Sequence, residues 1–298
     1  MNDNIVQPTS ATSFIPIRDR VHYGGACIGK EEIDAILRTI EKSGGFNWTI
    51  GEEGKEFERE LSEYTGHTYT ILANSGSSAL LLSFLALDLP QKSHVILPAT
   101  TFPTAFSSIF YAGLTPLLVD SKLSTFNIDE RSLEHALQNH QNVSAVVAVN
   151  IAGNIPNLER ILTLQKEYGF KLVLDNCDGF GGKYKGKPVE IFADVAATSF
   201  HAAHIVSMGE GGAVFTSDVR VVERARQFRD WGREGADDAI TQCAGLPCDY
   251  PKRYSYPVLG FNLKPLELQA AMGRIQMKKM EHFKKVRDEN VALLTRIF

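Results

Sequence analysis

Short apolar runs alternate with segments of helical periodicity along most of the chain, and this alternation constrains the fold more than any other feature. The runs cover residues 69–73, 95–97, 117–119, 145–149 and 171–174. Strands buried on both faces read as continuous apolar runs rather than as alternating ones. Helical segments between such strands predict a mainly parallel sheet with helices on both faces. We therefore expect an α/β fold.

Size and charge exclude several classes of protein. The chain has 298 residues, of which 44% are hydrophobic and 22% charged, so it is long enough for one large domain and a smaller one. Its net charge of −4 disfavours nucleic acid and anionic membranes as partners. No apolar run is long enough to span a bilayer, and the polar residues 1–13 predict a flexible leader without a secretory signal. We expect a cytoplasmic protein.

Metal binding has little support in the sequence. The four cysteines are Cys27, Cys177, Cys243 and Cys248, and no pair has the CxxC spacing of a metal or redox site. His201 and His204 are three residues apart, but no acidic ligands stand beside them. We expect free thiols and no metal.

A turn rich in serine follows the run at residues 69–73. Its sequence is Asn74-Ser75-Gly76-Ser77-Ser78, and a helical segment with Leu80, Leu81 and Phe84 comes next. Free backbone N–H groups and the helix dipole make such a helix start an anion site, for which phosphate is the natural occupant. A simple serine N-cap is the alternative.

Two further residues lie at the ends of predicted strands, where ligands bind in parallel sheets. They are Phe102 and Asp175, and we expect them to meet the serine turn in one crevice. A phosphate at Gly76 and Ser77, an aromatic ring against Phe102 and a protonated ring nitrogen against Asp175 would together suit pyridoxal phosphate. Taken alone, Asp175 would be explained as a turn-capping carboxylate.

These motifs, in this order, resemble the DegT/DnrJ/EryC1/StrS family of sugar aminotransferases. The resemblance extends from about residue 15 to the end of the chain. It rests on the serine turn, residues 98–102, Asp175 with Asp178, Ser199-Phe200-His201, residues 209–212 and residues 260–263. It implies the aspartate-aminotransferase fold (pyridoxal phosphate fold type I), with a three-layer αβα large domain and a mixed, mainly parallel sheet. Residues 14–250 would form this cofactor-binding domain, and residues 251–298 a linker and the first helix of an incomplete small domain.

The resemblance also assigns roles to site residues. The phosphate would be held by Gly76, Ser77 and Ser199, and the ring nitrogen by Asp175. Phe102 would stack on the ring, and Asp178 would lie near the ring hydroxyl. Asn262 would reach the phosphate of a neighbouring subunit, because active sites in this family lie at the interface of a homodimer.

One position departs from the aminotransferases. Where they have the lysine that forms a Schiff base with the cofactor, this chain has His204. An imidazole has no primary amine and cannot form that bond, but it carries protons near neutral pH. Lys171 and the lysines of the predicted hairpin at residues 183–187 are not placed to replace the missing amine.

A histidine at this position is the mark of the nucleotide-sugar 3-dehydratases, a subgroup that this chain resembles closely. Their pyridoxamine phosphate condenses with a nucleotide-linked 4-keto-6-deoxyhexose, the histidine removes a proton, and the C3 hydroxyl leaves as water. One branch has an iron–sulfur cluster on four cysteines. Cys243 and Cys248 are too few for it, which favours the cluster-free, colitose-type branch that regenerates its amine from glutamate in deoxysugar and O-antigen biosynthesis.

Two other functions stay open at this point. The first is a nucleotide-sugar aminotransferase of the same family, which His204 disfavours. The second is a non-catalytic relative that binds the cofactor or a partner, because members of this family continue into a small domain that this chain does not contain. The sequence does not distinguish GDP from CDP in the substrate.

Overall fold

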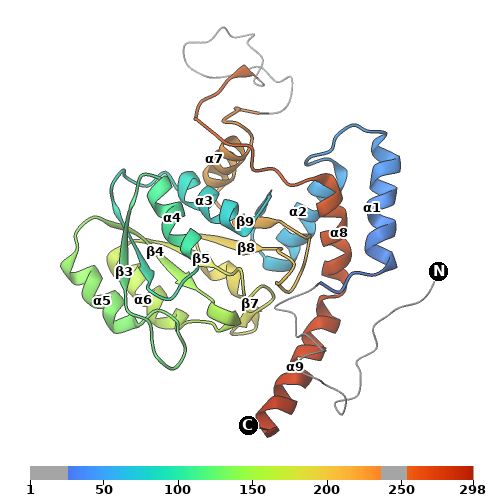
Figure 1. Cartoon of the computed structure of the whole chain (residues 1–298). Coiled ribbons are helices and arrows are strands. Elements are labelled where there is room, and N and C mark those ends of the chain that lie inside the picture. Colours follow the sequence, from blue (N-terminus) through green and yellow to red (C-terminus); the bar gives the residue numbers. More distant parts are fainter. Residues whose placement is uncertain (1–25, 236–253, 298) are drawn as a thin grey trace, which may run out of the picture.

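The computed structural model describes residues 26–235 and 254–297 (Figure 1). The predicted leader at residues 1–13 and the predicted domain boundary at residue 250 lie outside the described residues. So do most of residues 234–256, whose polar, proline-containing sequence predicts a long loop. Cys243 and Cys248 lie outside them as well.

A seven-stranded sheet forms the centre of the molecule, with the strand order β1-β9-β8-β5-β4-β2-β3. Its strands are β1 (Tyr69–Ala73), β2 (His94–Pro98), β3 (Thr115–Val119), β4 (Val143–Val149), β5 (Lys171–Asp175), β8 (Val195–Ser199) and β9 (Gly212–Thr216). β9 pairs antiparallel with both β1 and β8, and the pairs from β3 across to β8 are parallel. The predicted mixed, mainly parallel sheet is confirmed.

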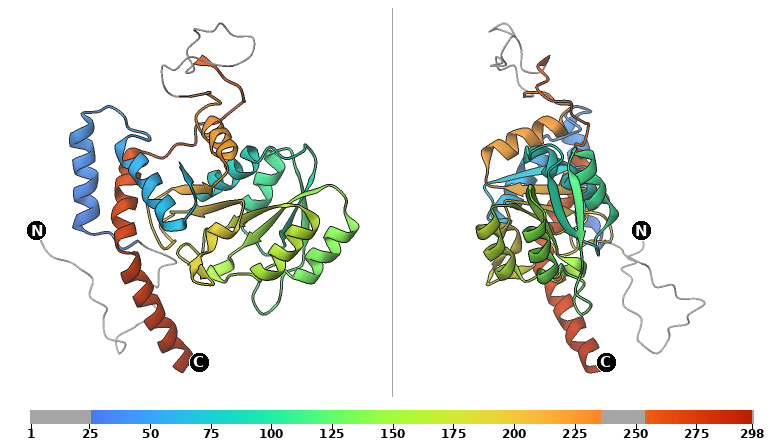
Figure 2. Two further views of the ribbon diagram at one scale, coloured as in Figure 1. Left: turned by 180° about the vertical axis from the view of Figure 1, so that it is seen from behind. Right: turned by 90° about the vertical axis from the view of Figure 1, so that its left-hand side faces the viewer.

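Helices cover both faces of the sheet (Figure 2). One hydrophobic cluster joins the sheet to α2 (Glu52–Thr65), α5 (Glu130–Asn139) and α6 (Leu158–Tyr168). A second cluster, on the other face, joins it to α3 (Gly76–Ala86), α4 (Pro103–Tyr111) and α7 (Val219–Arg229). The predicted three-layer αβα arrangement is therefore confirmed.

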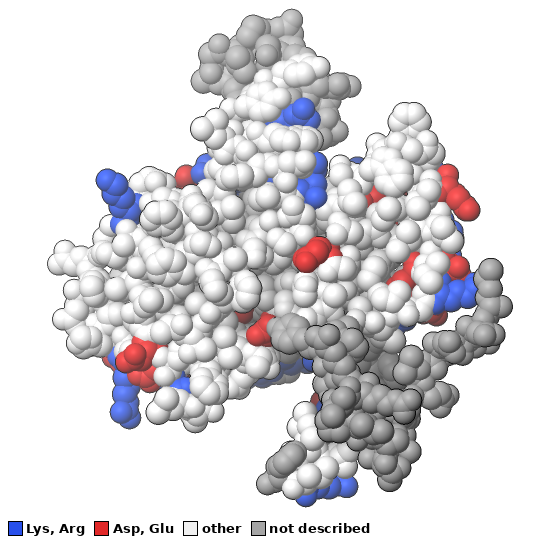
Figure 3. Space-filling model, viewed as in Figure 1, with Lys and Arg blue, Asp and Glu red and all other residues white. Residues whose placement is uncertain are grey.

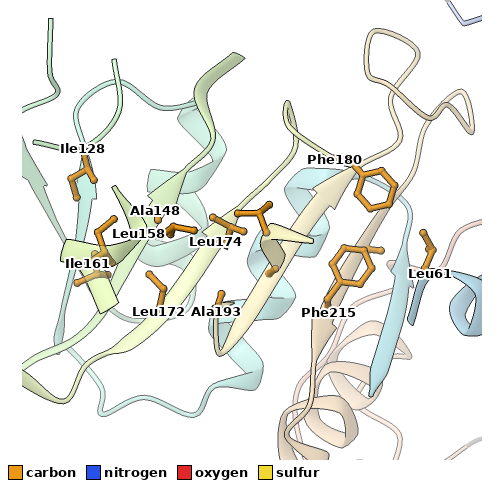
Figure 4. Packing of buried hydrophobic residues seen from close by; sticks show 14 of the residues in the cluster. Leu61, Ile128, Ala148, Leu158, Ile161, Leu172, Leu174, Phe180, Ala193 and Phe215 are labelled. Atoms are coloured by element: carbon orange, nitrogen blue, oxygen red, sulfur yellow. The ribbon is translucent and has the colours of Figure 1, made fainter. Parts of the chain in front are cut away.

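The two clusters explain why strand β4 is apolar from Ala145 to Val149. Val146 and Ala148 belong to the first cluster, whereas Ala145 and Val147 belong to the second. Successive side chains of a strand point to opposite faces, so a strand between two helical layers needs apolar residues at every position. Figure 4 shows part of the first cluster, with Ala148 beside Leu158 of α6.

Four short elements lie between the larger ones. Residues Ile151–Gly153 (η1) and Val189–Phe192 (η2) are 3₁₀ turns. Strands β6 (Lys183–Tyr184) and β7 (Lys187–Pro188) form the predicted hairpin. Element η2 leads from this hairpin towards β8 and contacts both α2 and β8.

The first helix, α1 (Lys30–Ser43), turns its apolar side chains outward. Ile33 and Leu37 are 53% and 51% exposed, whereas Glu32 and Thr39 are buried. Glu32 accepts a hydrogen bond from Gln276 of α8 (Glu267–Lys278) at 2.7 Å and pairs with Lys279 at 2.5 Å. Polar contacts therefore hold the inner face of α1, and its apolar face is available to another surface.

The sequence predicts a continuous helix from Leu263 to the end of the chain, and this prediction is wrong in two places. Leu263 and Leu266 precede the helix, and α8 begins at Glu267. Pro265 disfavours helical geometry at the residue before it. A break at Lys279 then separates α8 from α9 (Met280–Ile297).

Two properties of the described surface bear on partners. None of the helices in the described ranges is long and apolar enough to cross a membrane. Charged residues of both signs are scattered over the face seen in Figure 3, and neither sign forms a broad patch there.

Candidate active site

All strands of the main sheet except β9 direct their carboxyl ends to one edge. The serine turn follows β1 and Phe102 follows β2. Residues 175–178, which we call the acidic loop, lie at the end of β5, and His204 follows β8. The parallel sheet thus brings the predicted site segments to the edge where α/β proteins bind ligands.

The serine turn is built by local hydrogen bonds. Ser75 is the N-cap of α3, and its Oγ accepts from the Ser78 N–H at 3.1 Å. The Ser78 Oγ donates to Asn74 Oδ1 at 2.6 Å. The N–H groups of Gly76 and Ser77 precede the first intrahelical bond, from Ala79 to Ser75, so they are the helix-start donors that an anion uses. The predicted N-cap is confirmed, and the anion site at the same helix start stays a prediction.

Gly76 joins the serine turn to the rest of the site. A Cβ at this position would lie 2.6 Å from Ser199 Cβ and 3.0 Å from Cys177 Sγ. Only a glycine allows α3 to approach β8 and the acidic loop this closely. The structure therefore brings together Gly76 and Ser199, two of the predicted phosphate-binding residues.

Asp175 is a buried carboxylate at the end of β5. It is 4% exposed, and burial raises its pKa, an effect that the hydrogen bonds from the Cys177 thiol and the Cys177 N–H oppose. The N–H group donates to Asp175 Oδ1 at 3.2 Å. Asp178 and His204 also act on this pKa, the former raising it and the latter lowering it. A cationic group opposite Asp175 would offset the burial of its charge.

His204 lies in a tight loop that joins β8 to β9. Main-chain bonds from Phe200 to Gly211 and from Ala202 to Gly209 close this loop, and the His204 N–H donates to His201 O at 2.9 Å. The Nε2 atom of His204 lies 3.6 Å from Asp178 Oδ1. Its Nδ1 atom is buried and has no hydrogen-bond partner in the described structure. His204, Asp178 and Asp175 are thus close enough to interact.

Two predicted residues lie at the margin of this group. Phe102 is the N-cap residue of α4 and its ring is 65% exposed, so it is free to stack on a ligand. Asn262 is exposed and forms a bridge with Asp230, while the neighbouring Leu263 carbonyl accepts from the Asn74 N–H at 2.8 Å. Asn262 therefore lies one residue from a contact with the serine turn of its own subunit. Its reach into a neighbouring subunit stays a prediction.

Several polar residues around the acidic loop are absent from the predicted site. Asn150 directly follows the apolar run of β4, and that position could have marked it. The contact of Asn176 with Glu190 had no sequence signal, because 14 residues and a hairpin separate the two. His201, three residues before His204, has no predicted role beyond its motif and a weak metal pairing, and its ring meets that of His204 edge-on at 5.8 Å between centroids.

These residues fit a flat, phosphorylated heteroaromatic cofactor. Helix-start N–H groups suit its phosphate, and a buried carboxylate suits a protonated ring nitrogen. The unpartnered Nδ1 of His204 is a polar atom left for a ligand to satisfy. Within residues 26–235 and 254–297, no group of three or more His, Cys, Asp or Glu side chains could hold a metal ion.

Comparison with known proteins agrees with this fit. The model of the DegT/DnrJ/EryC1/StrS aminotransferase family matches residues 26–298. The lipopolysaccharide biosynthesis protein RfbH of Salmonella typhimurium is 34% identical over 96% of this chain and 68% of its own length. The dTDP-4-dehydro-2,6-dideoxy-D-glucose 3-dehydratase of Saccharopolyspora spinosa is 30% identical over 95% of this chain and 63% of its own length.

A solved structure shows the same fold. The E. coli GDP-4-keto-6-deoxy-D-mannose-3-dehydratase with bound hydrated PLP matches with a TM-score of 0.82 and 26% sequence identity, over 91% of this chain and 70% of that one. The chain thus spans between 63% and 70% of the length of these three proteins. By sequence and by structure, the chain belongs to the DegT/DnrJ/EryC1/StrS aminotransferase family.

Proposed function

We propose that the protein catalyses the C3 dehydration of a nucleotide-linked 4-keto-6-deoxyhexose, with His204 moving the proton. The observation that carries this proposal is an imidazole, rather than an amine, beside the acidic loop at the carboxyl edge of the sheet. Pyridoxal phosphate is the cofactor of this family. When bound, as the aldehyde or as pyridoxamine phosphate, it supplies an electron sink for negative charge that develops on the substrate.

The serine turn and Ser199 would hold the phosphate of the cofactor. Gly76 and Ser77 offer main-chain N–H groups, and the Ser199 hydroxyl lies beside Gly76. Asp175 would pair with the protonated ring nitrogen, and Asp178 would lie near the ring hydroxyl. Phe102 would cover one face of the ring. These roles of the predicted residues are part of the proposal.

His204 would accept the proton at Nδ1. Its Nε2 faces the Asp178 carboxylate at 3.6 Å, which favours the tautomer with the proton on Nε2 and leaves the lone pair on Nδ1. The buried Nδ1 has no partner in the described structure, so that lone pair is free to take a proton and later to return it to the departing hydroxyl. Asp178 would stabilise the imidazolium between these steps.

We propose a homodimer, with glutamate as the amino donor that restores the amine form of the cofactor. The outward apolar face of α1, with Ile33 and Leu37, favours contact with a second copy. Asn262 would complete the phosphate site of that copy. A cytoplasmic location stays a prediction.

The test combines the protein with pyridoxamine phosphate and GDP- or CDP-linked 4-keto-6-deoxyhexoses, and mass spectrometry follows loss of the C3 oxygen. His204→Lys should lower the dehydration rate by roughly 100-fold or more, because a positioned acid–base group contributes that much. His135→Lys, on the exposed side of α5, is the matched control and should react like the natural protein.

Three outcomes would argue against the proposal. Unchanged dehydration in His204→Lys would remove His204 from the mechanism. Transfer of an amino group by the natural protein, with borohydride fixing the cofactor to a lysine, would identify the aminotransferase alternative. Cofactor binding without any reaction would identify a non-catalytic relative.

A further inference from the structure

A chain of buried side-chain hydrogen bonds passes through Asn176 of the acidic loop. Asn150, at the end of β4, donates from Nδ2 to Asn176 Oδ1 at 2.5 Å. Asn176 in turn donates from Nδ2 to Glu190 Oε1 of η2 at 2.6 Å. All three residues are at most 1% exposed. The chain therefore ties the ends of β4 and β5 to the 3₁₀ turn that precedes β8.

Asn176 is the middle residue of this chain and belongs to the acidic loop. Its main-chain N–H donates to Ala197 O at 2.8 Å, and its carbonyl accepts from Thr198 Oγ1 at 3.0 Å. The main-chain N–H of Asn150 donates to Asp175 O at 3.0 Å. Every polar group of Asn176 has a partner, so its position fixes the residues on either side of it, Asp175 and Cys177.

Gly179 packs tightly against this series of hydrogen bonds. A Cβ at Gly179 would lie 2.6 Å from Asn176 Oδ1 and 3.1 Å from Asn150 Cβ. The pair of amides therefore has little room to rotate, and the direction of each hydrogen bond is set by the acceptor at the end of the chain. That acceptor is Glu190.

Glu190 is an unusual terminal acceptor. Burial raises its pKa from 4.5 to about 7, and hydrogen bonds from its own backbone and from Asn176 oppose this shift. Its Oε2 atom has no hydrogen-bond partner in the described structure. Two ionisable residues face it. Tyr64 of α2 has a pKa that is raised by burial and also by Glu190, and His67 contacts the Glu190 carbonyl through Nε2 at 2.8 Å. Burial lowers the pKa of His67, which favours its neutral form, so no cation faces this carboxyl group in the described structure.

We propose that Glu190 positions the acidic loop through Asn176 and Asn150, and that loss of its proton loosens this support. In the neutral state Glu190 completes a buried chain without introducing charge. A carboxylate with one side-chain donor in an apolar enclosure is costly, so ionisation favours an opening that admits water. Because Asn176 is part of the acidic loop, such an opening displaces Asp175.

The experiment measures two quantities, the protection of the acidic loop from hydrogen exchange and the affinity of the site for its cofactor. Amide hydrogen exchange of residues 175–179, corrected for its intrinsic pH dependence, reports the loop without a cofactor. The dissociation constant of pyridoxal phosphate, from its absorbance, reports the site. Both are measured at about pH 6 and about pH 8 for the natural chain, Glu190→Gln and Glu190→Leu. Glu167→Gln, at an exposed position on α6, is the matched control.

The natural chain and the control should lose roughly tenfold in protection and in cofactor affinity at the higher pH. Glu190→Gln keeps an acceptor for Asn176 but has no proton to lose, so its two values should change less than about twofold. Glu190→Leu removes the acceptor and should bind about tenfold more weakly at both pH values.

Equal pH responses in the natural chain and Glu190→Gln would overturn the proposal, and so would natural binding by Glu190→Leu. If Glu190→Leu does not fold, the comparison with Glu190→Gln decides alone. The binding measurement rests on the proposed function, but the exchange measurement does not. Failure of the natural chain to bind cofactor would therefore contradict the proposed function and leave the test of Glu190 intact.

Discussion

The two ends of the site are constructed in different ways. The serine turn is local, because its hydrogen bonds connect residues three or four positions apart. The acidic loop depends on distant residues, since Asn176 is held by Asn150, 26 positions before it, and by Glu190, 14 positions after it. The serine turn is thus formed by one segment, whereas the end of the site around Asp175 forms only when the sheet and η2 are in place.

Asp175→Asn is the change with the largest expected effect on this comparison. It removes the charge that would pair with the ring nitrogen, and breaking such a buried pair costs about 3 kcal/mol, so cofactor affinity should fall roughly 100-fold. Asp178→Asn provides the contrast, because this side chain is 47% exposed and water screens it. Titration with the cofactor, followed by absorbance, measures the affinity of both variants. Equal losses would mean that burial does not distinguish the two carboxylates.

Glu190→Gln tests the distant support of the acidic loop through stability. The pKa of Glu190 is raised by burial from 4.5 to about 7 in the folded state. The folded state therefore holds this proton more tightly, and the associated stability is complete below pH 4.5 and is lost as the pH rises through about 7. Between these limits the natural chain should lose about 3 kcal/mol that the variant does not lose. Urea unfolding at a series of pH values measures this. Parallel pH profiles would show that Glu190 does not titrate in this range.

Gly76→Ala tests the contact between the two ends. The new Cβ would lie 2.6 Å from Ser199 Cβ, and overpacking of this kind costs about 2 kcal/mol, partly offset by the better helix propensity of alanine. Gly29→Ala is the control, because its Cβ would meet its nearest neighbour at 3.7 Å. Thermal unfolding compares them, and cofactor affinity should fall in Gly76→Ala alone. A Gly76→Ala protein as stable as the control would show that β8 adjusts easily.

The same contrast explains how much the sequence could predict. The serine turn follows directly from residue types, since serines and a glycine after a strand leave few alternatives. The strands were also predictable, because β4 is apolar at every buried position, and so is β5 as far as Leu174. The hydrogen bond between Asn176 and Glu190 could not be predicted, because it depends on how the hairpin of β6 and β7 returns to the sheet.

Helix α1 shows a second limit of sequence reasoning. Its periodicity predicts the helix between Gly29 and Ser43, and the structure confirms it. Periodicity does not tell which face turns inward. Here Glu32 contacts Gln276 and Lys279, and these polar contacts leave Ile33 exposed. Residues that lie more than 200 positions away in the sequence therefore determine which face of α1 is buried.

The close approach at Gly76 couples the two ends of the site mechanically. The start of α3 lies against Ser199 and Cys177 with no spare room, so neither end can shift without moving the other. If the site holds its cofactor as proposed, this contact would set the distance between the phosphate and the ring nitrogen that the site accepts. A longer or shorter molecule would then have to displace β8 or the start of α3.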